Sequence, residues 1–168
     1  MNKFLYDKET SLLLVIDVQN NFINKNTKKI PNRIIKLIKD NKFNYVVFTK
    51  FINDIGSNFY KILNYKGCIE ENDKKIVIDT KDNKILEKRT YTALNKELID
   101  YIEKNKINTI YVCGIDTDAC VLKTAIDLFE SNYNVKVIEN CCMSHSGKKY
   151  HKYAIKMLKK LIGKENIL

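Results

Sequence analysis

Long apolar runs are missing from this chain of 168 residues. No segment approaches the ~18 uninterrupted apolar residues that a membrane-spanning helix needs, so we expect no membrane partner. The first nine residues contain no hydrophobic core of a cleavable signal peptide. Repeats, low-complexity linkers and breaks in composition are also missing, and the length suffices for a full hydrophobic core. The sequence therefore predicts one globular domain over residues 1–168.

Disulfide and metal-binding patterns are missing as well. The five cysteines include the adjacent pair Cys141 and Cys142 but no Cys-x-x-Cys motif, and the only two histidines, His145 and His151, lie far downstream. This cysteine usage predicts reduced thiols, with no disulfide framework and no zinc site. Reduced thiols in turn indicate a cytoplasmic protein.

Arginine is scarce although the chain is strongly basic. The formal net charge is +10, and Arg33 and Arg89 are the only arginines among 30 basic residues. Such a charge could attract nucleic acid or an anionic membrane. However, lysine, isoleucine and asparagine are abundant throughout, which indicates coding bias, and the basic stretch 148–160 has the spacing of an amphipathic helix with a solvated face. We therefore expect no nucleic-acid partner, while a weak attraction for anionic substrates stays open.

Strand-like and helix-like segments alternate along the chain. Strands are predicted at 12–16, 45–49, 75–78, 109–113 and 135–138, and helices at 31–39, 92–105, 119–131 and 146–162. The weak periodicity of 51–67 indicates an irregular loop with a short helix. This alternation predicts an α/β fold in three layers, with a mostly parallel sheet and helices on both faces.

The most informative segment is VCGIDTDACV at 112–121. A predicted strand runs into Gly114, and after a short polar turn a helix begins with Cys120 in its first turn. A thiol there faces exposed backbone N–H groups and the positive end of the helix dipole, which favour a thiolate and can bind an oxyanion. From these residues alone Cys120 is either a nucleophile or a buried structural cysteine. The structural interpretation suits Cys113 better, because Cys113 lies inside the strand.

Two other segments place polar side chains after strands. Asp17 ends the apolar run LLLVI, which is typical of a strand buried on both faces, and ligands of open parallel sheets bind beyond such strand ends. Lys88 follows a short apolar stretch and precedes a predicted helix. Taken alone, Asp17 is more simply a turn or capping residue and Lys88 a solvated surface lysine.

Taken together, the three segments resemble the isochorismatase-like cysteine hydrolase family, which includes nicotinamidases and N-carbamoylsarcosine amidases. The resemblance rests on the ordered motifs DVQNNF at 17–22, KRTYTAL at 88–94 and GIDTDACV at 114–121, and it covers nearly the whole chain. It implies an isochorismatase-like, Rossmann-like α/β fold and a catalytic triad of Asp17, Lys88 and Cys120.

The resemblance also implies a role for each of these residues. Cys120 would be the nucleophile, Asp17 the general base and later the acid, and Lys88 a charge that stabilises both. The backbone N–H groups of Asp116 and Cys120 would form the oxyanion hole, and the Ile115–Asp116 peptide bond is expected to be cis.

Four further residues near these motifs are assigned roles from their type and position. Thr117 and Asp118 are interpreted as turn and helix-capping residues. Phe22 and Tyr91 are candidates for substrate binding, because aromatic side chains often line pockets for small planar molecules. Ordinary core packing explains Phe22 and Tyr91 equally well.

Histidine is absent where the resemblance would place a metal site. Nicotinamidases of the family usually carry a histidine-containing cluster after the second strand, and residues 49–58, TKFINDIGSN, contain no histidine. Bound zinc or iron is therefore not expected, and no other cofactor is implied. True isochorismatases cleave a vinyl ether and lack the cysteine, so Cys120 argues against that reaction.

These residues predict a metal-independent cysteine hydrolase that cleaves an amide, ureide or carbamoyl C–N bond of a small molecule through a thioester. Two alternatives stay open: nicotinamidase activity without the usual metal, and a non-enzymatic binding or scaffold protein on the same fold. The loop after Thr49 is unusually apolar and predicts a homodimer or larger homo-oligomer, unless its side chains only cover the pocket. Its apolar residues are Phe51, Ile52, Ile55, Phe59 and Tyr60.

Overall fold

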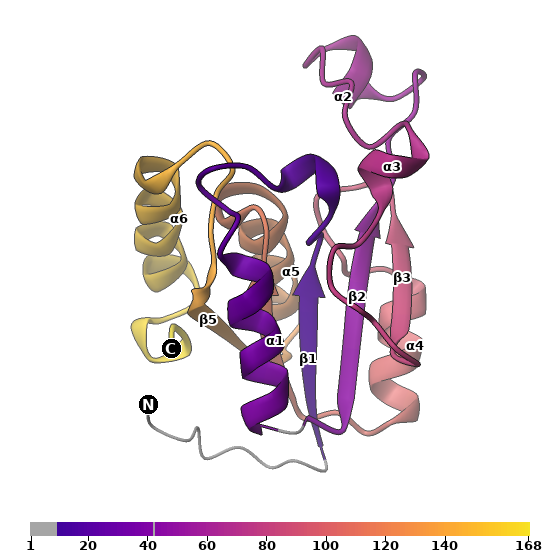
Figure 1. Cartoon of the computed structure of the whole chain (residues 1–168). Helices are drawn as coiled ribbons and strands as arrows, with labels where there is room; N and C mark the ends of the chain where they lie inside the picture. Colours follow the sequence, from indigo (N-terminus) through magenta and orange to yellow (C-terminus); the bar gives the residue numbers. More distant parts are fainter. Residues whose placement is uncertain (1–9, 42) are drawn as a thin grey trace.

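Five parallel strands form the central sheet of the computed structural model, which describes residues 10–41 and 43–168 (Figure 1). The signal-peptide expectation concerns residues 1–9, which lie outside the described residues. The strand order is β3-β2-β1-β4-β5. The strands are β1 (Ser11–Ile16), β2 (Tyr45–Phe51), β3 (Lys84–Lys88), β4 (Thr109–Gly114) and β5 (Asn134–Cys142).

Helices cover both faces of the sheet, which confirms the predicted three-layer α/β architecture. The helix α1 (Ile30–Asn41) lies in front of the sheet in Figure 1, while α4 (Lys96–Lys104) and α5 (Leu122–Glu130) lie behind it. The helix α6 (Lys148–Leu161) packs against α5. Two single-turn helices, α2 (Asn58–Lys61) and α3 (Glu71–Lys74), lie beyond the carboxyl end of the sheet.

The predicted third strand at 75–78 is wrong. There Ile76 forms only an isolated antiparallel bridge with Gln19, and the strand beside β2 is β3. In β3 only Leu86 and Lys88 point inward, because the strand lies at the sheet edge and alternates buried with more exposed residues. The sequence of β3 therefore contains no continuous hydrophobic run, whereas residues 75–78 do contain one. For this reason the hydrophobic pattern predicted a strand at 75–78 and not at β3.

The helices α4 and α5 begin three or more residues later than the sequence predicts. The helix α4 begins after Asn95, whose side chain accepts a hydrogen bond from the Leu98 N–H, so 92–95 belongs to a loop. The helix α5 is preceded by η2 (Thr117–Val121), a π-helical turn, where the sequence predicted regular helix from 119. Such turns widen the helix by one residue and often occur at functional sites.

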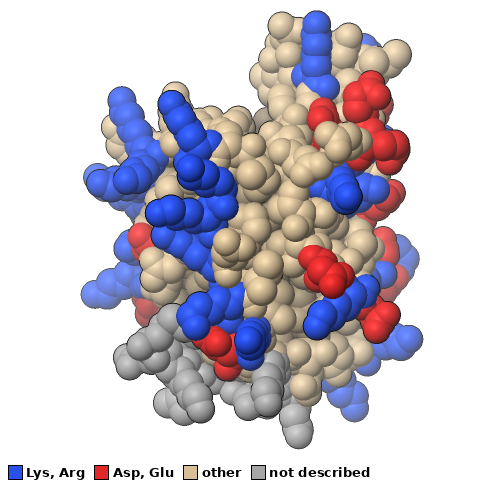
Figure 2. All heavy atoms as spheres, in the orientation of Figure 1, with Lys and Arg blue, Asp and Glu red and all other residues tan. Residues whose placement is uncertain are grey.

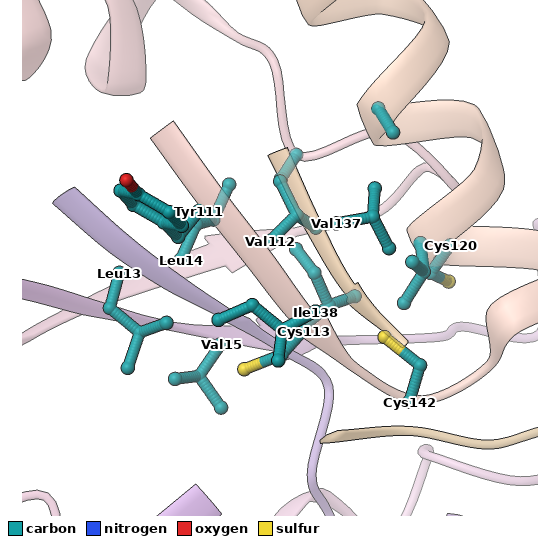
Figure 3. Packing of buried hydrophobic residues seen from close by; sticks show 14 of the residues in the cluster. Leu13, Leu14, Val15, Tyr111, Val112, Cys113, Cys120, Val137, Ile138 and Cys142 are labelled. Atoms are coloured by element: carbon teal, nitrogen blue, oxygen red, sulfur yellow. The ribbon is translucent and has the colours of Figure 1, made fainter. Parts of the chain in front are cut away.

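The core is built around β1, whose residues 11–16 are all buried. Figure 3 shows side chains of β1, β4 and β5 packed together in one cluster. The labelled members include Leu14, Val112, Val137 and Cys113, and Cys113 is fully buried inside β4 as predicted. A strand that is apolar on both faces must lie at the centre of such a sheet, which fixes the position of its last residue and of Asp17 after it.

Gly114 allows the ends of β1 and β4 to approach closely. Its φ is +125°, and a Cβ atom there would lie 2.1 Å from the carbonyl oxygen of Ile16. Every other residue type would clash with that backbone. The close approach places the turn that contains Cys120 beside the end of β1.

Candidate active site

Asp17 lies directly after β1 and is fully buried. Its backbone has φ 45°, in the left-handed region that only short polar residues and glycine adopt readily. Thr49, near the end of β2, holds both the main chain and the side chain of Asp17. The Asp17 N–H donates to Thr49 Oγ1 over 3.0 Å, and Thr49 Oγ1 donates to Asp17 Oδ1 over 2.5 Å. Asp17 is therefore a fixed carboxylate and not a solvent-exposed turn residue.

Lys88, the last residue of β3, is also buried and is not a surface lysine. Its Nζ lies 2.7 Å from Asp17 Oδ2, with side-chain exposures of 1% and 0%. The same ammonium donates to the carbonyl oxygens of Thr90 (2.8 Å) and Tyr91 (3.2 Å) and lies 5.2 Å from the centroid of the Phe51 ring. A buried charge needs such partners, because desolvation without them costs several kcal/mol, on the order of the whole stability of a domain.

Cys120 lies in the η2 turn and completes the group. Lys88 Nζ donates to Cys120 Sγ over 3.5 Å. Burial raises the pKa of Cys120 well above its usual value, the charge of Asp17 raises it further, and the charge of Lys88 lowers it. The resting side chain is therefore a thiol beside a carboxylate, although its place near a helix start had predicted a thiolate. Burial and the charge of Asp17 outweigh the opposing effect of Lys88 on the pKa of Cys120.

The three side chains together contain a proton donor, a proton acceptor and a fixed cation. Burial alone would lower the pKa of Lys88, but the charge of Asp17 and the hydrogen bond to it raise this pKa above its ordinary value. Lys88 therefore stays an ammonium at neutral pH. A proton can pass from the Cys120 thiol to the Asp17 carboxylate, and the thiolate formed would lie against the Lys88 cation. The structure thus brings together the three residues that the sequence singled out.

The backbone before Cys120 turns sharply at Asp116. The Ile115–Asp116 peptide bond is cis, as the resemblance implied. The Asp116 carbonyl accepts hydrogen bonds from the N–H groups of Ala119 (3.2 Å) and Val121 (3.0 Å), on either side of Cys120. The oxyanion-hole role of the Asp116 and Cys120 N–H groups stays a proposal.

The interpretation of Thr117 and Asp118 as turn residues agrees with the structure, but their interpretation as helix-capping residues is wrong. Both lie inside η2, and neither side chain caps a helix in the described part of the chain. Thr117 Oγ1 instead forms a 2.8 Å hydrogen bond with His151 Nδ1, which ties η2 to α6. The hydroxyl of Thr117 is thus engaged with α6 and does not cap a helix.

A cavity of about 300 Å³ opens beside Cys120. Phe22 and Tyr91, the candidate substrate-binding residues, both line it. Phe51, which the structure places at the end of β2, lines it too, as does Phe59 from the apolar loop, so part of that loop does cover the pocket of its own chain. The complete lining is Phe22, Phe51, Phe59, Leu63, Tyr65, Tyr91, Asp116, Asp118, Ala119, Cys120 and His145. Flat apolar walls of this kind suit a small planar molecule.

An acid–imidazole pair forms part of the cavity wall. His145, in the segment after β5, donates its backbone N–H to Asp116 Oδ1 over 2.7 Å, and its ring Nδ1 contacts Asp116 Oδ2. The hydrogen bond to Asp116 raises the pKa of His145, and burial opposes this rise. Burial raises the pKa of Asp116, while the hydrogen bonds from His145 lower it. Sequence reasoning missed this pair, since 29 positions separate the two residues.

The residues after β2 do not suit a metal centre. Asn53 uses its side chain for hydrogen bonds to the carbonyl oxygens of Tyr65 (2.9 Å) and Gly67 (3.1 Å), and Asp54 pairs at the surface with Arg89. Among residues 10–41 and 43–168, no three His, Cys, Asp or Glu side chains are grouped so that they could hold a metal ion. The carboxamide of Asn53 instead fixes the loop that carries Phe59 and Tyr65.

Positive charge gathers away from the cavity lining. Figure 2 shows lysine and arginine side chains concentrated over α1 and α6. In α6 the apolar positions Ala154, Ile155 and Leu158 are buried and the lysines lie mainly on the solvated face, as the helical spacing predicted. None of the helices in the described ranges combines the length and hydropathy required to cross a bilayer.

Comparison of the sequence with known proteins identifies similar proteins and a matching family model. The family model described as "Isochorismatase domain" matches residues 11–164. "Isochorismatase family protein 2A" of Dictyostelium discoideum is 25% identical over 158 residues, which cover 90% of this chain and 74% of that protein. The chain spans only 65% of the length of two further family proteins of that organism.

Solved structures share the fold. An isochorismatase-like hydrolase from Alkaliphilus metalliredigens superimposes with a TM-score of 0.80 at 18% identity, covering 94% of this chain and 93% of that one. Nicotinamidase PncA from Bacillus subtilis superimposes with a TM-score of 0.77 at 21% identity, covering 92% and 97%. At such identities these matches establish the fold alone. The family model spans nearly the whole described chain, and on that ground the chain belongs to the isochorismatase domain family.

Proposed function

We propose that this chain is a cysteine hydrolase that cleaves the C–N bond of a small amide, ureide or carbamoyl compound without a metal ion. The observation that carries the proposal is the contact of Lys88 with both Asp17 and Cys120 beside an aromatic cavity. A nucleophile next to a base, with a third group that orients both, is the arrangement that acyl-transfer chemistry requires.

In the first half-reaction the thiol proton of Cys120 passes to Asp17 while sulfur attacks the carbonyl carbon. The negative charge that develops on the carbonyl oxygen would be bound by the N–H groups of Asp116 and Cys120. The C–N bond then breaks as Asp17 returns the proton to the leaving nitrogen, which departs as ammonia or an amine. A thioester on Cys120 remains.

In the second half-reaction water attacks the thioester carbon while Asp17 accepts its proton. The C–S bond breaks, the acid product leaves, and the proton on Asp17 returns to the sulfur. Lys88 keeps its proton throughout, since the pKa of Lys88 is raised. Its part is to hold the carboxylate in place and to stabilise the thiolate when it forms.

Ammonia release from a panel of small amides, ureides and carbamoyl compounds tests this proposal. The wild-type chain should release ammonia from at least one of them, and Cys120→Ala should release none. Rapid acid quenching should trap an acyl group on Cys120 that intact-mass measurement detects. Release that survives in Cys120→Ala, or a turnover with no acyl adduct at any substrate concentration, would contradict the thioester route.

Nicotinamidase activity without the usual metal is the second candidate. The cavity volume of about 300 Å³ and its aromatic walls suit a single six-membered ring. Nicotinamide therefore belongs in the substrate panel, assayed with and without added metal. If no compound is turned over and the five thiols are modified in order of exposure alone, a non-enzymatic binding or scaffold protein becomes the better interpretation.

The compartment is a further part of the proposal. All five cysteines are free thiols, and none is in a disulfide. A nucleophilic thiol needs to stay reduced, so a reducing compartment such as the cytoplasm suits this chemistry.

A further inference from the structure

His145 lines the same cavity as Cys120 but has no part in the proposed reaction. Its position is fixed from several sides. Asn24 and Asn26 donate side-chain hydrogen bonds to its carbonyl oxygen over 2.9 and 3.0 Å, and its ring packs against Phe22 with centroids 6.1 Å apart. A side chain held in this way presents one defined face to the cavity.

Asp116 decides which ring nitrogen is left for a ligand. Both Asp116 carboxylate oxygens are engaged by His145, one by the backbone N–H and the other by ring Nδ1. Nδ1 therefore carries a proton, and the second ring nitrogen, Nε2, has no hydrogen-bond partner among residues 10–41 and 43–168. An imidazole whose Nδ1 is hydrogen-bonded to a carboxylate is held in one orientation, and its Nε2 remains free to form a hydrogen bond with a ligand in the cavity.

The charges around the cavity make this imidazole distinctive. Among the described residues that line it, His145 is the only basic one. Burial raises the pKa of Tyr65 and of Tyr91, so both phenols stay neutral at physiological pH, and the resting Cys120 is a thiol. Two acids also line the wall. Asp116 is paired with His145, and Asp118 has one carboxylate oxygen buried without a hydrogen-bond partner.

We propose that His145, positioned by Asp116, sets the specificity of the cavity by donating a hydrogen bond from Nε2 to an acceptor oxygen of the substrate. The aromatic walls would pack against a flat apolar part of the substrate, and Cys120 would attack the scissile carbonyl. The substrate class is therefore a small planar amide with a second acceptor group, best a carboxylate. The charge of Asp118 works against an anion, so the preference depends on the imidazolium of His145 and not on a generally positive cavity.

The proton on His145 gives this preference a pH dependence. The hydrogen bond to Asp116 and the nearby charges of Asp116 and Asp118 raise the pKa of His145, against the opposing effect of burial. The imidazolium, and with it the advantage of an acidic ligand, is present below the pKa of His145. The advantage falls as pH rises through that pKa, because a neutral imidazole donates a weaker hydrogen bond and carries no charge.

This inference rests on the proposed function, because Cys120 defines where the amide lies. Its test nevertheless uses binding and not turnover. The probes are benzamide, 3-carbamoylbenzoate and 4-carbamoylbenzoate. Each is titrated against the wild-type chain while the rate of Cys120 alkylation by iodoacetamide is followed by mass spectrometry. The concentration that halves this rate measures occupancy of the cavity, and comparing ligands at the same pH cancels the pH dependence of the thiol.

At mildly acidic pH at least one of the two acids should protect Cys120 at a concentration about tenfold lower than benzamide, as expected for a charge-assisted hydrogen bond. His145→Gln should remove that advantage, and mildly alkaline pH should do the same in the wild type. His151→Gln is the matched control, since His151 does not line the cavity and should leave the advantage intact.

A second variant keeps the test decisive if His145→Gln fails to fold. Asp116→Asn removes the carboxylate that raises the pKa of His145, so the pH at which the advantage disappears should move down. Equal protection by benzamide and both acids, or an advantage that survives His145→Gln, would overturn the inference. Ammonia release from benzamide with equal protection would reject only the inference, whereas an acid advantage without any ammonia release would reject only the proposed reaction.

Discussion

Lys88 Nζ lies 2.7 Å from Asp17 Oδ2 in an ion pair that is almost completely sealed from solvent. The two residues come from strands that do not pair with each other, since β2 lies between β1 and β3. Thr49 of that middle strand holds the other Asp17 oxygen. Three adjacent strand ends thus converge on one carboxylate, and a change at any of them should affect both stability and chemistry.

Removing the buried cation should destabilise the fold. Lys88→Met leaves the Asp17 carboxylate buried without its partner, so the free energy of unfolding should fall by about 3–5 kcal/mol in urea denaturation. The double variant Asp17→Asn/Lys88→Met removes both charges and should recover part of this loss. Lys50→Met breaks the surface pair with Glu87 and should cost no more than about 1 kcal/mol. Similar small losses for Lys88→Met and Lys50→Met would contradict the burial argument.

Two cysteines should separate activity from packing. Cys120→Ala should abolish turnover with little change in the free energy of unfolding, because the side chain lies at the cavity wall. Cys113→Ala, inside β4, should retain turnover and lose stability on the order of 1 kcal/mol. Ammonia-release assays and urea denaturation measure the two effects. The prediction fails if both variants lose activity in proportion to lost folding.

Asp17→Asn should make Cys120 more reactive toward alkylation while it stops turnover. The charge of Asp17 raises the pKa of Cys120, and Lys88 lowers it. Without the carboxylate the thiol pKa falls, so a larger fraction is thiolate at neutral pH and iodoacetamide should react faster. Amide hydrolysis should nevertheless be lost, because the leaving nitrogen has no proton donor. A parallel fall in alkylation and hydrolysis would show that Asp17 does not act through its charge and its proton in this way.

Extended chelation should leave activity unchanged. The segment after β2 contains no histidine, and the side chain of Asn53 is engaged by the carbonyl oxygens of Tyr65 and Gly67. Turnover measured before and after prolonged treatment with a strong chelator should therefore agree. Activity that disappears on chelation and returns with zinc, iron or manganese would require a metal in the mechanism.

The chain should associate through its protruding apolar loop. Ile55 and Ile62 are 69% and 72% exposed in the segment around α2, next to cavity residues Phe59 and Leu63. Such a patch favours a self-association surface, so light scattering should detect a dimer or larger homo-oligomer. Ile62→Asp should shift it toward monomer, whereas Ile35→Asp, at a 46% exposed position on α1, should not. Light scattering that shows the wild-type chain as a monomer at micromolar concentration would contradict this prediction.

Local patterns of the sequence determined the centre of the fold, while the three residues around which the site forms were singled out by the resemblance of three ordered motifs to a known family. The run LLLVI is typical of a central strand and forms one in the structure, and Asp17 follows it directly. Likewise, the segment 109–120 specifies a strand, a glycine at the turn and a cysteine before a helix. These features depend on neighbours within a few positions, so periodicity and turn chemistry reveal them.

Only the tertiary structure decided which segments meet. Thr49 reaches Asp17 across 32 positions, His145 reaches Asp116 across 29, and β3 lies at the sheet edge although another segment is more apolar. Two signals were nonetheless available, since Thr49 ends the predicted second strand and His145 is one of two histidines. The state of Cys120 was likewise beyond the sequence. The pKa of a thiol depends on burial and on charges brought from β1 and β3, and these arise only when the strands pack together.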